Sequence, residues 1–505
     1  MIGLSAAIAW QAASRPNAPA FAFAGETVDY AELDRRILRV GGWLTVQDVR
    51  AGDVVAVLLR NSPAFIELAF AASHIGAVFL PINFRLAADE VAYILADSGA
   101  VLLIADDDLP AARGHPLRTI LLDAAARTSM MGMAAGAESA PAYPSEPEDL
   151  FRILYTSGTT DRPKGVMHSY ANYHWKCADH VTVLGLSADT RLLVVGPLYH
   201  VGAFDLPGMA VLAQGGMIVL LREFDPESAL AAIAKHRLDG AWLAPVMTSA
   251  LLSHPSRARH DVSSLRWVIG GGERTPENRI REFADHFVNA RYIDAYGLTE
   301  SLSGDTFMDA GREIEKIGST GRATPHVEIA ILDDAGEIVA TGAEGEICLR
   351  GPKVTKGYWR APEKTAASFV RGWFRTGDVG YLDEEGYLFI TDRKKDMILS
   401  GGENIASSEV ERIVQLFPAV LEAAVIGLPD DRWGEVPVAV VVARPGASIT
   451  AEEMIAHCRV HLAGFKIPRR LVLRDSLPRN PSGKILKRVL RAELAAVQPT
   501  TGASS

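Results

Sequence analysis

Short runs of consecutive apolar residues alternate with segments of helical spacing through most of this 505-residue chain. Such runs are candidate strands, because a strand covered on both faces is apolar at every position rather than at alternate ones. Five of them span residues 53–59, 101–104, 191–195, 217–221 and 265–269. Segments between them, such as 65–75 and 226–236, have apolar residues at helical spacing. The alternation predicts an α/β fold whose large domain has layers rich in parallel sheet.

The pattern changes after about residue 391. We expect a large domain of residues 1–391, a charged hinge at 392–396 and a small α+β domain of residues 397–505. In the small domain, Ser408-Glu-Val-Glu411 and Thr450-Ala-Glu-Glu453 each have the capping-box pattern that begins a helix. Residues 438–442 are typical of a strand. Residues 124–147, rich in Ala, Ser and Pro, are the most linker-like interior segment.

Charge and cysteine content exclude several classes of protein. Lys and Arg number 51 against 61 Asp and Glu, and this net charge of −10 argues against the basic face of a nucleic-acid binder. Three scattered cysteines without a CxxC pair predict a reducing, cytoplasmic environment. The first residues lack the basic start of a signal peptide. The longest apolar run, 206–221, is interrupted by Pro207, Gln214 and two glycines, so we expect no membrane-spanning segment.

One segment has the composition of a phosphate-binding loop, Tyr155-Thr-Ser-Gly-Thr-Thr-Asp-Arg-Pro-Lys-Gly165. Small hydroxylated residues around a glycine leave backbone N–H groups and hydroxyls free to surround phosphate oxygens, and Lys164 adds a positive charge. The segment is not a Walker A loop, because Pro163 and Gly165 stand where that motif needs Gly and Ser or Thr. Taken alone, the segment favours phosphate binding over the alternative, a Ser/Thr-rich surface turn.

Five segments in this order resemble the motifs of the adenylate-forming superfamily of acyl-CoA synthetases, luciferases and peptide-synthetase adenylation domains. They are the segment after Tyr155, Tyr296-Gly-Leu-Thr-Glu300, Trp373-Phe-Arg-Thr-Gly-Asp378, residues 392–405, and Leu477-Pro-Arg-Asn-Pro-Ser-Gly-Lys484. The resemblance covers nearly the whole chain. Within it, Ser400-Gly-Gly-Glu-Asn-Ile405 resembles fatty-acyl and aryl-CoA ligases most. The resemblance implies ATP-dependent activation of a carboxylate as an acyl-adenylate, followed by transfer of the acyl group to coenzyme A.

The resemblance also implies roles for individual residues in adenylation. Lys484 is the expected catalytic lysine, which bridges the carboxylate and the α-phosphate and masks their negative charge. Glu300, together with Thr156, is the expected Mg²⁺ ligand, and Thr299 is a phosphate contact. His200 is expected to gate the carboxylate end of the acid. The expected ATP contacts are Thr156, Ser157, Gly158, Thr159, Thr160, Lys164, Gly271, Gly272, Glu273, Asp294, Tyr296, Gly297, Asp378 and Arg393.

Further expectations concern the nucleoside. The two carboxylate oxygens of Asp378 suit the vicinal hydroxyls of a ribose, and Arg393 is expected at the same sugar. Gly270-Gly-Gly-Glu273 resembles an adenine-side loop, in which glycines let the backbone lie against a flat base, with Tyr296 as the opposite stacking face. Asp161 departs from the family pattern, which usually has Gly there, and adds negative charge near the phosphates.

The small domain is expected to rotate about Lys395 between two poses, the first of which delivers Lys484 for adenylation. The second pose forms the thioester, with coenzyme A lying in a tunnel. The indole of Trp433 is the expected platform for the adenine of coenzyme A. The expected contacts of coenzyme A are Gly401, Gly402, Trp433, Phe465 and Arg469.

The resemblance also implies a pocket that binds the acid. The expected acid pocket is apolar and aromatic, which favours a medium- or long-chain fatty acid, with an aromatic acid next. Its expected residues are His200, Val201, Phe204, Trp242 and Gly270. Phe204-Asp205 also resembles amino-acid-activating relatives, in which the Asp holds the substrate ammonium, although Leu206-Pro207 follows here. Delivery to a carrier protein and an inactive nucleotide-binding scaffold are the remaining alternatives. We expect a monomer or a homodimer.

Overall fold

The structure is a computed structural model, which describes residues 3–156, 163–272, 275, 277–393, 396–400, 403–430, 432–479 and 484–496. The chain divides into two compact units. The larger unit comprises Met1–Ile329, Leu349–Phe374 and Gly386–Leu388, and the smaller unit comprises Ala330–Cys348, Arg375–Glu385 and Phe389–Ser505. The expected division into residues 1–391 and 397–505 stays a prediction, and the expected hinge residue, Lys395, lies outside the described residues.

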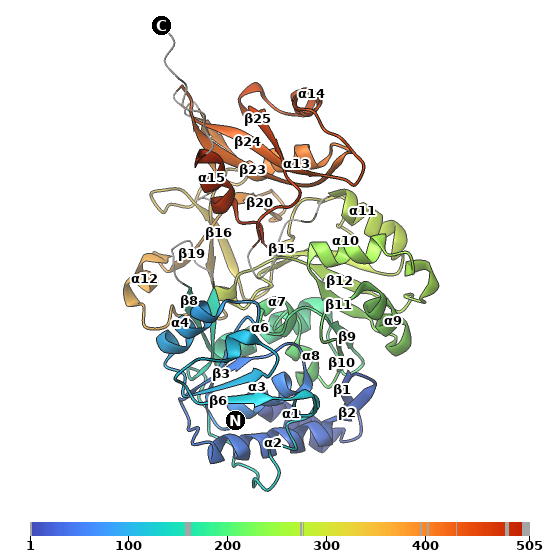
Figure 1. Cartoon of the computed structure of the whole chain (residues 1–505), viewed down its shortest axis with the longest axis vertical. Coiled ribbons are helices and arrows are strands. Elements are labelled where there is room, and N and C mark those ends of the chain that lie inside the picture. Colours follow the sequence, from blue (N-terminus) through green and yellow to red (C-terminus); the bar gives the residue numbers. More distant parts are fainter. Residues whose placement is uncertain are drawn as a thin grey trace. The chain divides into compact units, whose positions relative to one another are not determined.

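Two sheets rich in parallel strands form the layers of the larger unit (Figure 1). Their strands are β1 (Pro19–Phe23), β2 (Glu26–Asp29), β3 (Val54–Leu58), β4 (Val78–Pro81), β5 (Leu102–Asp106), β6 (Thr119–Leu122), β7 (Leu150–Thr156), β8 (Lys164–Ser169), β9 (Arg191–Val194), β10 (Met217–Leu220), β11 (Gly240–Leu243), β12 (Trp267–Gly270), β13 (Arg291–Tyr296), β14 (Thr306–Phe307) and β15 (Arg322–Ala323). One sheet has the order β15-β14-β13-β12-β11-β9-β10-β1-β2, with parallel pairing from β13 to β1. The other has the order β6-β5-β3-β4-β7-β8, in which only β8 is antiparallel to its neighbour. The predicted α/β class is confirmed.

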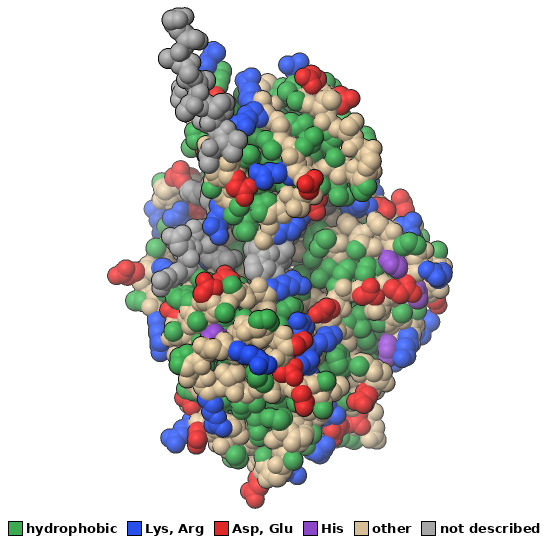
Figure 2. All heavy atoms as spheres, viewed as in Figure 1, with side chains coloured by type: hydrophobic (Ala, Val, Ile, Leu, Met, Phe, Trp, Pro, Cys, Tyr) green, Lys and Arg blue, Asp and Glu red, His purple; other side chains and the backbone are tan. Residues whose placement is uncertain are grey.

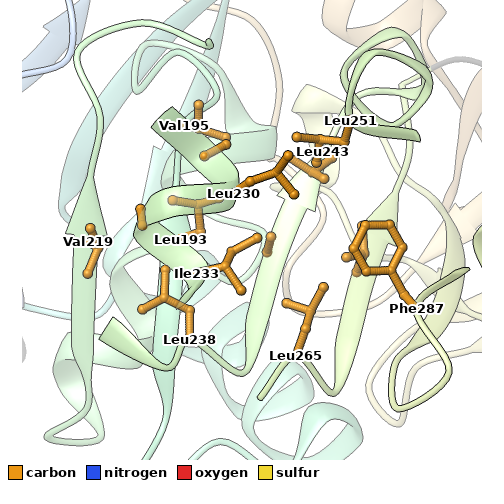
Figure 3. Close-up of a cluster of buried hydrophobic side chains, with 14 of the residues drawn as sticks. Leu193, Val195, Val219, Leu230, Ile233, Leu238, Leu243, Leu251, Leu265 and Phe287 are labelled. Carbon is orange, nitrogen blue, oxygen red and sulfur yellow. The ribbon is translucent and has the colours of Figure 1, made fainter. Parts of the chain in front are cut away.

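The predicted strands of the larger unit are confirmed with small shifts at their ends. Every residue of β3, β5, β10 and β12 is buried, as strands covered on both faces require. Figure 3 shows one such covering layer, in which Leu230 and Ile233 of the helix Pro226–His236 pack with Leu193 and Leu243 of the sheet. That helix begins where the sequence predicts, because Asp225 accepts a hydrogen bond from the backbone N–H of Ser228 and Pro226 occupies the first turn.

Helices cover the sheets of the larger unit. They are α1 (Leu4–Ser14), α2 (Tyr30–Val46), α3 (Pro63–His74), α4 (Ala88–Ser98), α5 (Ala124–Thr128), α6 (Tyr170–Leu184), α7 (Val201–Phe204), α8 (Met209–Ala213), α9 (Pro226–His236), α10 (Pro245–Ser253), α11 (Glu277–His286) and α12 (Pro362–Ala367). Across the described part of the chain, no helix combines the length and the apolar character that a membrane crossing needs. Basic and acidic side chains are mixed on the face drawn in Figure 2.

Strands β16 (Glu328–Leu332), β17 (Gly345–Arg350), β18 (Phe369–Val370), β19 (Trp373–Leu382) and β20 (Leu388–Arg393) form a further five-stranded sheet. The last sheet lies within the smaller unit and contains β21 (Ile398–Ser400), β22 (Glu403–Ile405), β23 (Val420–Asp430), β24 (Gly434–Ala443) and β25 (Arg470–Leu473). Its helices are α13 (Ser407–Gln415), α14 (Ala451–His461) and α15 (Lys487–Ala496). Alternate residues of β23 and β24 pack on opposite faces, one with α13 and α14 and the other with α15.

The two predicted capping boxes have different outcomes. Thr450 caps α14 as predicted, because its side chain accepts a hydrogen bond from the N–H of Glu453, whose carboxylate accepts one from Thr450. The prediction for α13 is wrong, since that helix begins at Ser407 and its cap position, Ala406, has no side-chain hydrogen bond. Glu411, the expected partner, instead accepts hydrogen bonds in the interior of the unit, including the N–H of Val425.

The prediction of a linker at residues 124–147 is also wrong. Within this segment, Met130 and Ala134 are buried, and the carboxylate of Glu67 in α3 accepts a hydrogen bond from the N–H of Met130 at 2.7 Å. The backbone of Glu138 lies so close to Gly42 of α2 that no Cβ fits there. Small residues therefore let this segment pack on α2 and α3.

Candidate active site

The carboxyl ends of four neighbouring strands, β9, β11, β12 and β13, meet at one edge of the nine-stranded sheet. Trp242 lies near the end of β11, residues 270–272 lie at the end of β12, and residues 296–297 lie at the end of β13. Ligands of open α/β sheets bind outside the carboxyl ends of the strands. The topology thus places these predicted acid and adenine residues at the edge where a ligand is expected.

Glycines at the ends of β12 and β13 are required by close contacts. A Cβ at Gly270 would overlap the hydroxyl of Tyr292, and one at Gly297 would overlap the backbone of Gly304. Gly272 has a φ of +94° and open space where a Cβ would point. The end of β12 therefore presents bare backbone, as an adenine-side loop needs. Two other expected ATP contacts, Asp294 and Tyr296, are buried, whereas Glu273 lies outside the described residues.

The predicted phosphate loop joins two antiparallel strands, β7 and β8. Its residues Ser157, Gly158, Thr159 and Thr160, together with Asp161, lie outside the described residues. Its two flanks are described, and Thr156 at the end of β7 pairs with Lys164 at the start of β8. The predicted Mg²⁺ ligand Thr156 and the predicted phosphate cation Lys164 are therefore neighbours across a strand pair.

The hydroxyl of Tyr358, a residue outside the five predicted motifs, links Glu300 to Lys164. The hydroxyl of Tyr358 donates a hydrogen bond to Oε1 of Glu300 at 2.8 Å, and Nζ of Lys164 donates to the hydroxyl of Tyr358 at 2.7 Å. Nζ of Lys164 lies 3.8 Å from Oε1 of Glu300. Burial lowers the pKa of Lys164, whereas the charge of Glu300 opposes that effect. The pKa of Tyr358 is raised by burial and by Glu300, which keeps this phenol protonated as a donor.

The surroundings of Glu300 fit a hydrated Mg²⁺ ion. Its side chain is largely buried, and both contacts that described residues make with its carboxylate go to Oε1. Oε2 is therefore left by these residues for another ligand. Mg²⁺ is held in proteins by one or two carboxylates together with phosphate oxygens and water, so one carboxylate beside a phosphate loop is sufficient.

The loop after Glu300 has an unusual backbone. Leu302, Ser303 and Gly304 have φ values of 57°, 66° and 68°, and two of them carry a Cβ that disfavours this left-handed region. Lys353 stabilises the loop, because its fully buried Nζ donates hydrogen bonds to the carbonyl of Gly304 at 2.6 Å and to that of Ser303 at 3.4 Å. The same Nζ lies 3.1 Å from Oδ1 of Asp305. Lys353 also lies outside the five predicted motifs.

Thr299, the predicted phosphate contact, begins a 3-10 turn over Thr299–Ser301. Its backbone carbonyl accepts a hydrogen bond from Nε2 of His168 at 2.7 Å, and Nε of Arg152 donates to Nδ1 of the same ring at 3.1 Å. A guanidinium only donates, so Nδ1 must be an acceptor and the proton must lie on Nε2. Burial, followed by the charge of Arg152, lowers the pKa of His168 well below its usual value and keeps the ring neutral.

The carboxylate of Asp205 is engaged within the protein. Asp205 is fully buried, and its Oδ2 accepts a hydrogen bond from Nη2 of Arg152 at 2.6 Å. The buried Nζ of Lys176 donates to the backbone carbonyl of Asp205 at 2.9 Å and lies 3.8 Å from Oδ1. The side chains of Arg152 and Lys176 thus pair with the carboxylate that would hold the ammonium of an amino-acid substrate. This arrangement argues against the amino-acid alternative.

Trp242 and His200 form an aromatic wall. Their rings are nearly parallel, with centroids 6.2 Å apart and planes 25° apart. A Cβ at Gly196 or Gly202 would overlap the indole of Trp242, so the indole lies directly against backbone. Nδ1 of His200 accepts a hydrogen bond from the N–H of Gly202 at 3.1 Å, which fixes the ring.

The other predicted acid-pocket residues of α7 are buried. Val201 is 3% exposed, and Phe204 is fully buried and packs against the rings of Phe65 and Phe79. The guanidinium of Arg152 lies over the ring of Phe204 at 5.2 Å. The contacts of Phe204 thus run into the protein core, and its role in an acid pocket stays a prediction.

Several predicted site residues belong to the smaller unit. Asp378, the expected ribose acceptor, is buried in β19, and the hydroxyl of Thr376 accepts a hydrogen bond from its N–H. Of Arg393 only the backbone is described. Lys484, the expected catalytic lysine, is half-buried and precedes Ile485, which forms a β-bridge with Arg479.

The expected contacts of coenzyme A also lie in the smaller unit. Trp433 and Phe465 are each 38% exposed. A cation flanks each ring, since the guanidinium of Arg432 lies 4.9 Å from the ring centroid of Trp433 and Nζ of Lys466 lies 5.7 Å from that of Phe465. Arg469 is exposed, whereas Gly401 and Gly402 lie outside the described residues. Exposed rings beside cations suit an anionic nucleotide.

Comparison with protein families finds two matches. Residues 8–359 match the AMP-binding enzyme model, and residues 409–484 match the model of the AMP-binding enzyme C-terminal domain.

Among curated proteins, the chain is 39% identical to the feruloyl-CoA synthase of an Amycolatopsis species, over 94% of this chain and 96% of that protein. It is 36% identical to the long-chain-fatty-acid–CoA ligase FadD13 of Mycobacterium tuberculosis, over 93% of this chain and 94% of that protein.

Among solved structures, the chain resembles the o-succinylbenzoate CoA synthetase of Bacillus subtilis in complex with its acyl-adenylate intermediate. The TM-score is 0.88 and the identity 31%, over 96% of this chain and 97% of that one. A second structure of that enzyme, in complex with ATP and a magnesium ion, matches with a TM-score of 0.86 and 30% identity, over 95% of this chain and 98% of that one.

Proposed function

This chain belongs to the family of AMP-binding enzymes and is an AMP-forming acid–CoA ligase, and we propose that its acid is an aromatic carboxylic acid. The observation that carries the choice of acid is the wall formed by Trp242 and His200. Flat, fixed rings favour a planar substrate, because stacked aromatic pairs gain free energy beyond their area of burial. The sequence alone favours a fatty acid first, and this wall reverses the order.

In the first half-reaction, a carboxylate oxygen attacks the α-phosphorus of ATP. A new P–O bond forms, the bond to pyrophosphate breaks, and acyl-AMP results. Two anions must approach each other, so we assign Lys484 to the reacting oxygens and Lys164 to the departing phosphates. Glu300 and Thr156 would hold Mg²⁺, which neutralises charge on the phosphate oxygens when it is bound.

In the second half-reaction, the thiol sulfur of coenzyme A attacks the acyl carbonyl. The C–S bond forms, the thiol proton is lost and AMP leaves. We assign Trp433, Phe465 and Arg469 to the nucleotide of coenzyme A, because exposed rings and a cation suit an adenine that carries phosphates. Rotation of the small domain between the two half-reactions, with Lys395 as its hinge, belongs to the same proposal.

A panel of acids tests the choice of substrate. We expect ferulate- and cinnamate-like acids to give a higher kcat/KM for CoA-dependent AMP release than octanoate or palmitate. Trp242→Ala should lower kcat/KM for the aromatic acids by about tenfold and raise it for longer acids, because the wall is removed. Higher kcat/KM for palmitate in the wild-type enzyme would overturn the aromatic assignment. FadD13, a relative, is named for long-chain fatty acids, so this outcome defines the second candidate.

The same assay separates the remaining alternatives. Acid-dependent pyrophosphate exchange without a thioester of free coenzyme A would indicate delivery to a carrier protein. Absence of exchange with every acid would indicate an inactive nucleotide-binding scaffold. The cytoplasmic location and the monomeric or dimeric state stay predictions, to be tested by fractionation and by light scattering.

A further inference from the structure

We propose that His168 is a positioning residue for Glu300, acting through a buried chain of hydrogen bonds that runs from Asp205 through Arg152 and His168 to the Thr299 carbonyl. The inference deepens the proposed function, because it rests on Glu300 as the carboxylate that holds Mg²⁺. We call the chain of Asp205, Arg152 and His168 the buried relay.

The buried relay is built from strands and a loop that are far apart in the sequence. Arg152 in β7 and His168 in β8 pair with each other across the two strands. Asp205 follows α7, and its contact with Arg152 anchors the guanidinium. All three side chains are at most 1% exposed. A charged arginine in the interior is costly unless it is paired, so Asp205 holds Arg152 in one place.

The relay also fixes the orientation of the imidazole. Nε of Arg152 donates to Nδ1, and Nε2 donates to the carbonyl of Thr299. A ring rotated by 180° would place Cδ2–H against the guanidinium and Cε1–H against the carbonyl, and the other tautomer would place an N–H against the guanidinium, where two donors would face each other. His168 therefore presents a directed N–H to the Thr299 carbonyl, and its hydrogen bond from Arg152 selects this tautomer.

Hydrogen bonds on both sides of Glu300 hold its backbone. The carbonyl of Thr299, in the peptide that precedes Glu300, accepts from His168. The carbonyl of Glu300 itself accepts from the N–H of Thr355 at 2.6 Å. If the first bond is removed, the Thr299 carbonyl keeps a hydrogen bond from the N–H of Leu302 at 3.1 Å, but the peptide before Glu300 loses its anchor to β8 and the carboxylate can shift with it. Partners that orient a metal ligand typically alter metal affinity or activity by about ten- to a hundredfold when they are lost.

Substitutions at position 168 separate positioning from simple packing. His168→Leu fills the space but neither accepts from Arg152 nor donates to Thr299. His168→Gln keeps an oxygen that accepts and a nitrogen that donates, at a similar spacing. His168→Asn has the same groups on a shorter side chain that cannot reach both partners, and it replaces the Leu variant if that variant does not fold.

Calorimetric titration of the full-length protein with ATP, with and without Mg²⁺ and without any acid, measures the position of Glu300 directly. We expect the gain in ATP affinity that Mg²⁺ produces to fall by about tenfold in His168→Leu or His168→Asn, and to be largely restored in His168→Gln. ATP affinity without Mg²⁺ should stay near the wild-type value. Tyr30→Phe, which removes a buried hydrogen bond to the Leu212 and Gly216 carbonyls, controls for general loss of stability and should leave the gain unchanged.

Two results would overturn the proposal. One is a folded His168→Leu or His168→Asn variant in which Mg²⁺ increases ATP affinity as much as it does in the wild-type protein. The other is equal loss of ATP binding with and without Mg²⁺ in all three variants, which would indicate a purely structural role. If the wild-type enzyme binds ATP with Mg²⁺ but activates no acid, the proposed function fails, and the binding titration still decides on the relay.

Discussion

The surroundings of Glu300 in the larger unit and those of Trp433 in the smaller unit are built in opposite ways. Glu300 is 9% exposed, and the side chains that hold its loop, His168 and Lys353, are fully buried. Trp433 and Phe465 are open to solvent, and each is flanked by one cation of its own segment. The contrast indicates a rigid site where charge must be placed accurately, and an adaptable surface where a ligand supplies the missing contacts.

The largest expected effect comes from Lys353→Met, which leaves the buried carboxylates of Asp179 and Asp305 without this partner. We expect the free energy of unfolding to fall by about 3–5 kcal/mol in urea denaturation. Lys356→Met is the matched control, since Lys356 is exposed and pairs with the exposed Glu148, and it should cost less than about 1 kcal/mol. Equal costs for the two variants would contradict the buried, rigid construction inferred for the surroundings of Glu300.

Lys484→Ala should lower acid-dependent pyrophosphate exchange by about a hundredfold or more, because a cation at the reacting oxygens is lost. Thioester formation from supplied acyl-adenylate should stay near the wild-type rate. The two half-reactions are measured separately on the same preparation. Equal loss of both would contradict the assignment of Lys484 to adenylation.

Trp433→Ala should raise KM for coenzyme A by at least about fivefold, the lower value for one stacked base, and leave KM for ATP unchanged. Trp10→Ala removes a more exposed indole, 64% against 38%, from α1 and serves as the control, which should alter neither KM. A changed KM for ATP would indicate that Trp433 contacts ATP and not coenzyme A.

The last prediction concerns pH. Burial lowers the pKa of His168 well below 6.5, and the same cause lowers that of His180. The unfolded chain therefore binds protons below about pH 6.5 that the folded chain does not, and the free energy of unfolding falls there by up to about 1.4 kcal/mol per pH unit for each histidine. His168→Gln should reduce this slope by one proton in urea titrations at several pH values. An unchanged slope would show that His168 is protonated in the folded protein.

Local patterns predicted the strands of the larger unit, because burial on both faces leaves a signature within a few residues. The buried relay and Lys353 left a weaker signal. A single arginine stands in the apolar run Leu150-Phe-Arg-Ile-Leu154, and its partner Asp205 is 53 residues away in the sequence. His168 contacts a carbonyl 131 residues away. Such pairs are set by the tertiary fold, which no short pattern encodes.

At the start of α13, by contrast, a local pattern predicted a capping box that the structure does not form. Ser408 and Glu411 have the spacing of a capping box, yet tertiary contacts compete for both side chains. The hydroxyl of Ser408 donates to the Thr391 carbonyl, and Glu411 accepts from Val425 and pairs with Lys487. A local motif therefore predicts a helix start only where the interior makes no stronger demand on the same groups.

The contact between the Trp242 indole and the bare backbone of Gly196 and Gly202 ties these three positions together. Any side chain at position 202 has to displace the indole, and a smaller residue at 242 leaves room that the two glycines cannot fill. Directed evolution toward bulkier acids would therefore begin with a smaller residue at 242, and larger residues at 196 and 202 would be accepted only after that change. Libraries that vary positions 196, 202 and 242 jointly can exchange one flat surface for a differently shaped cavity in a single step.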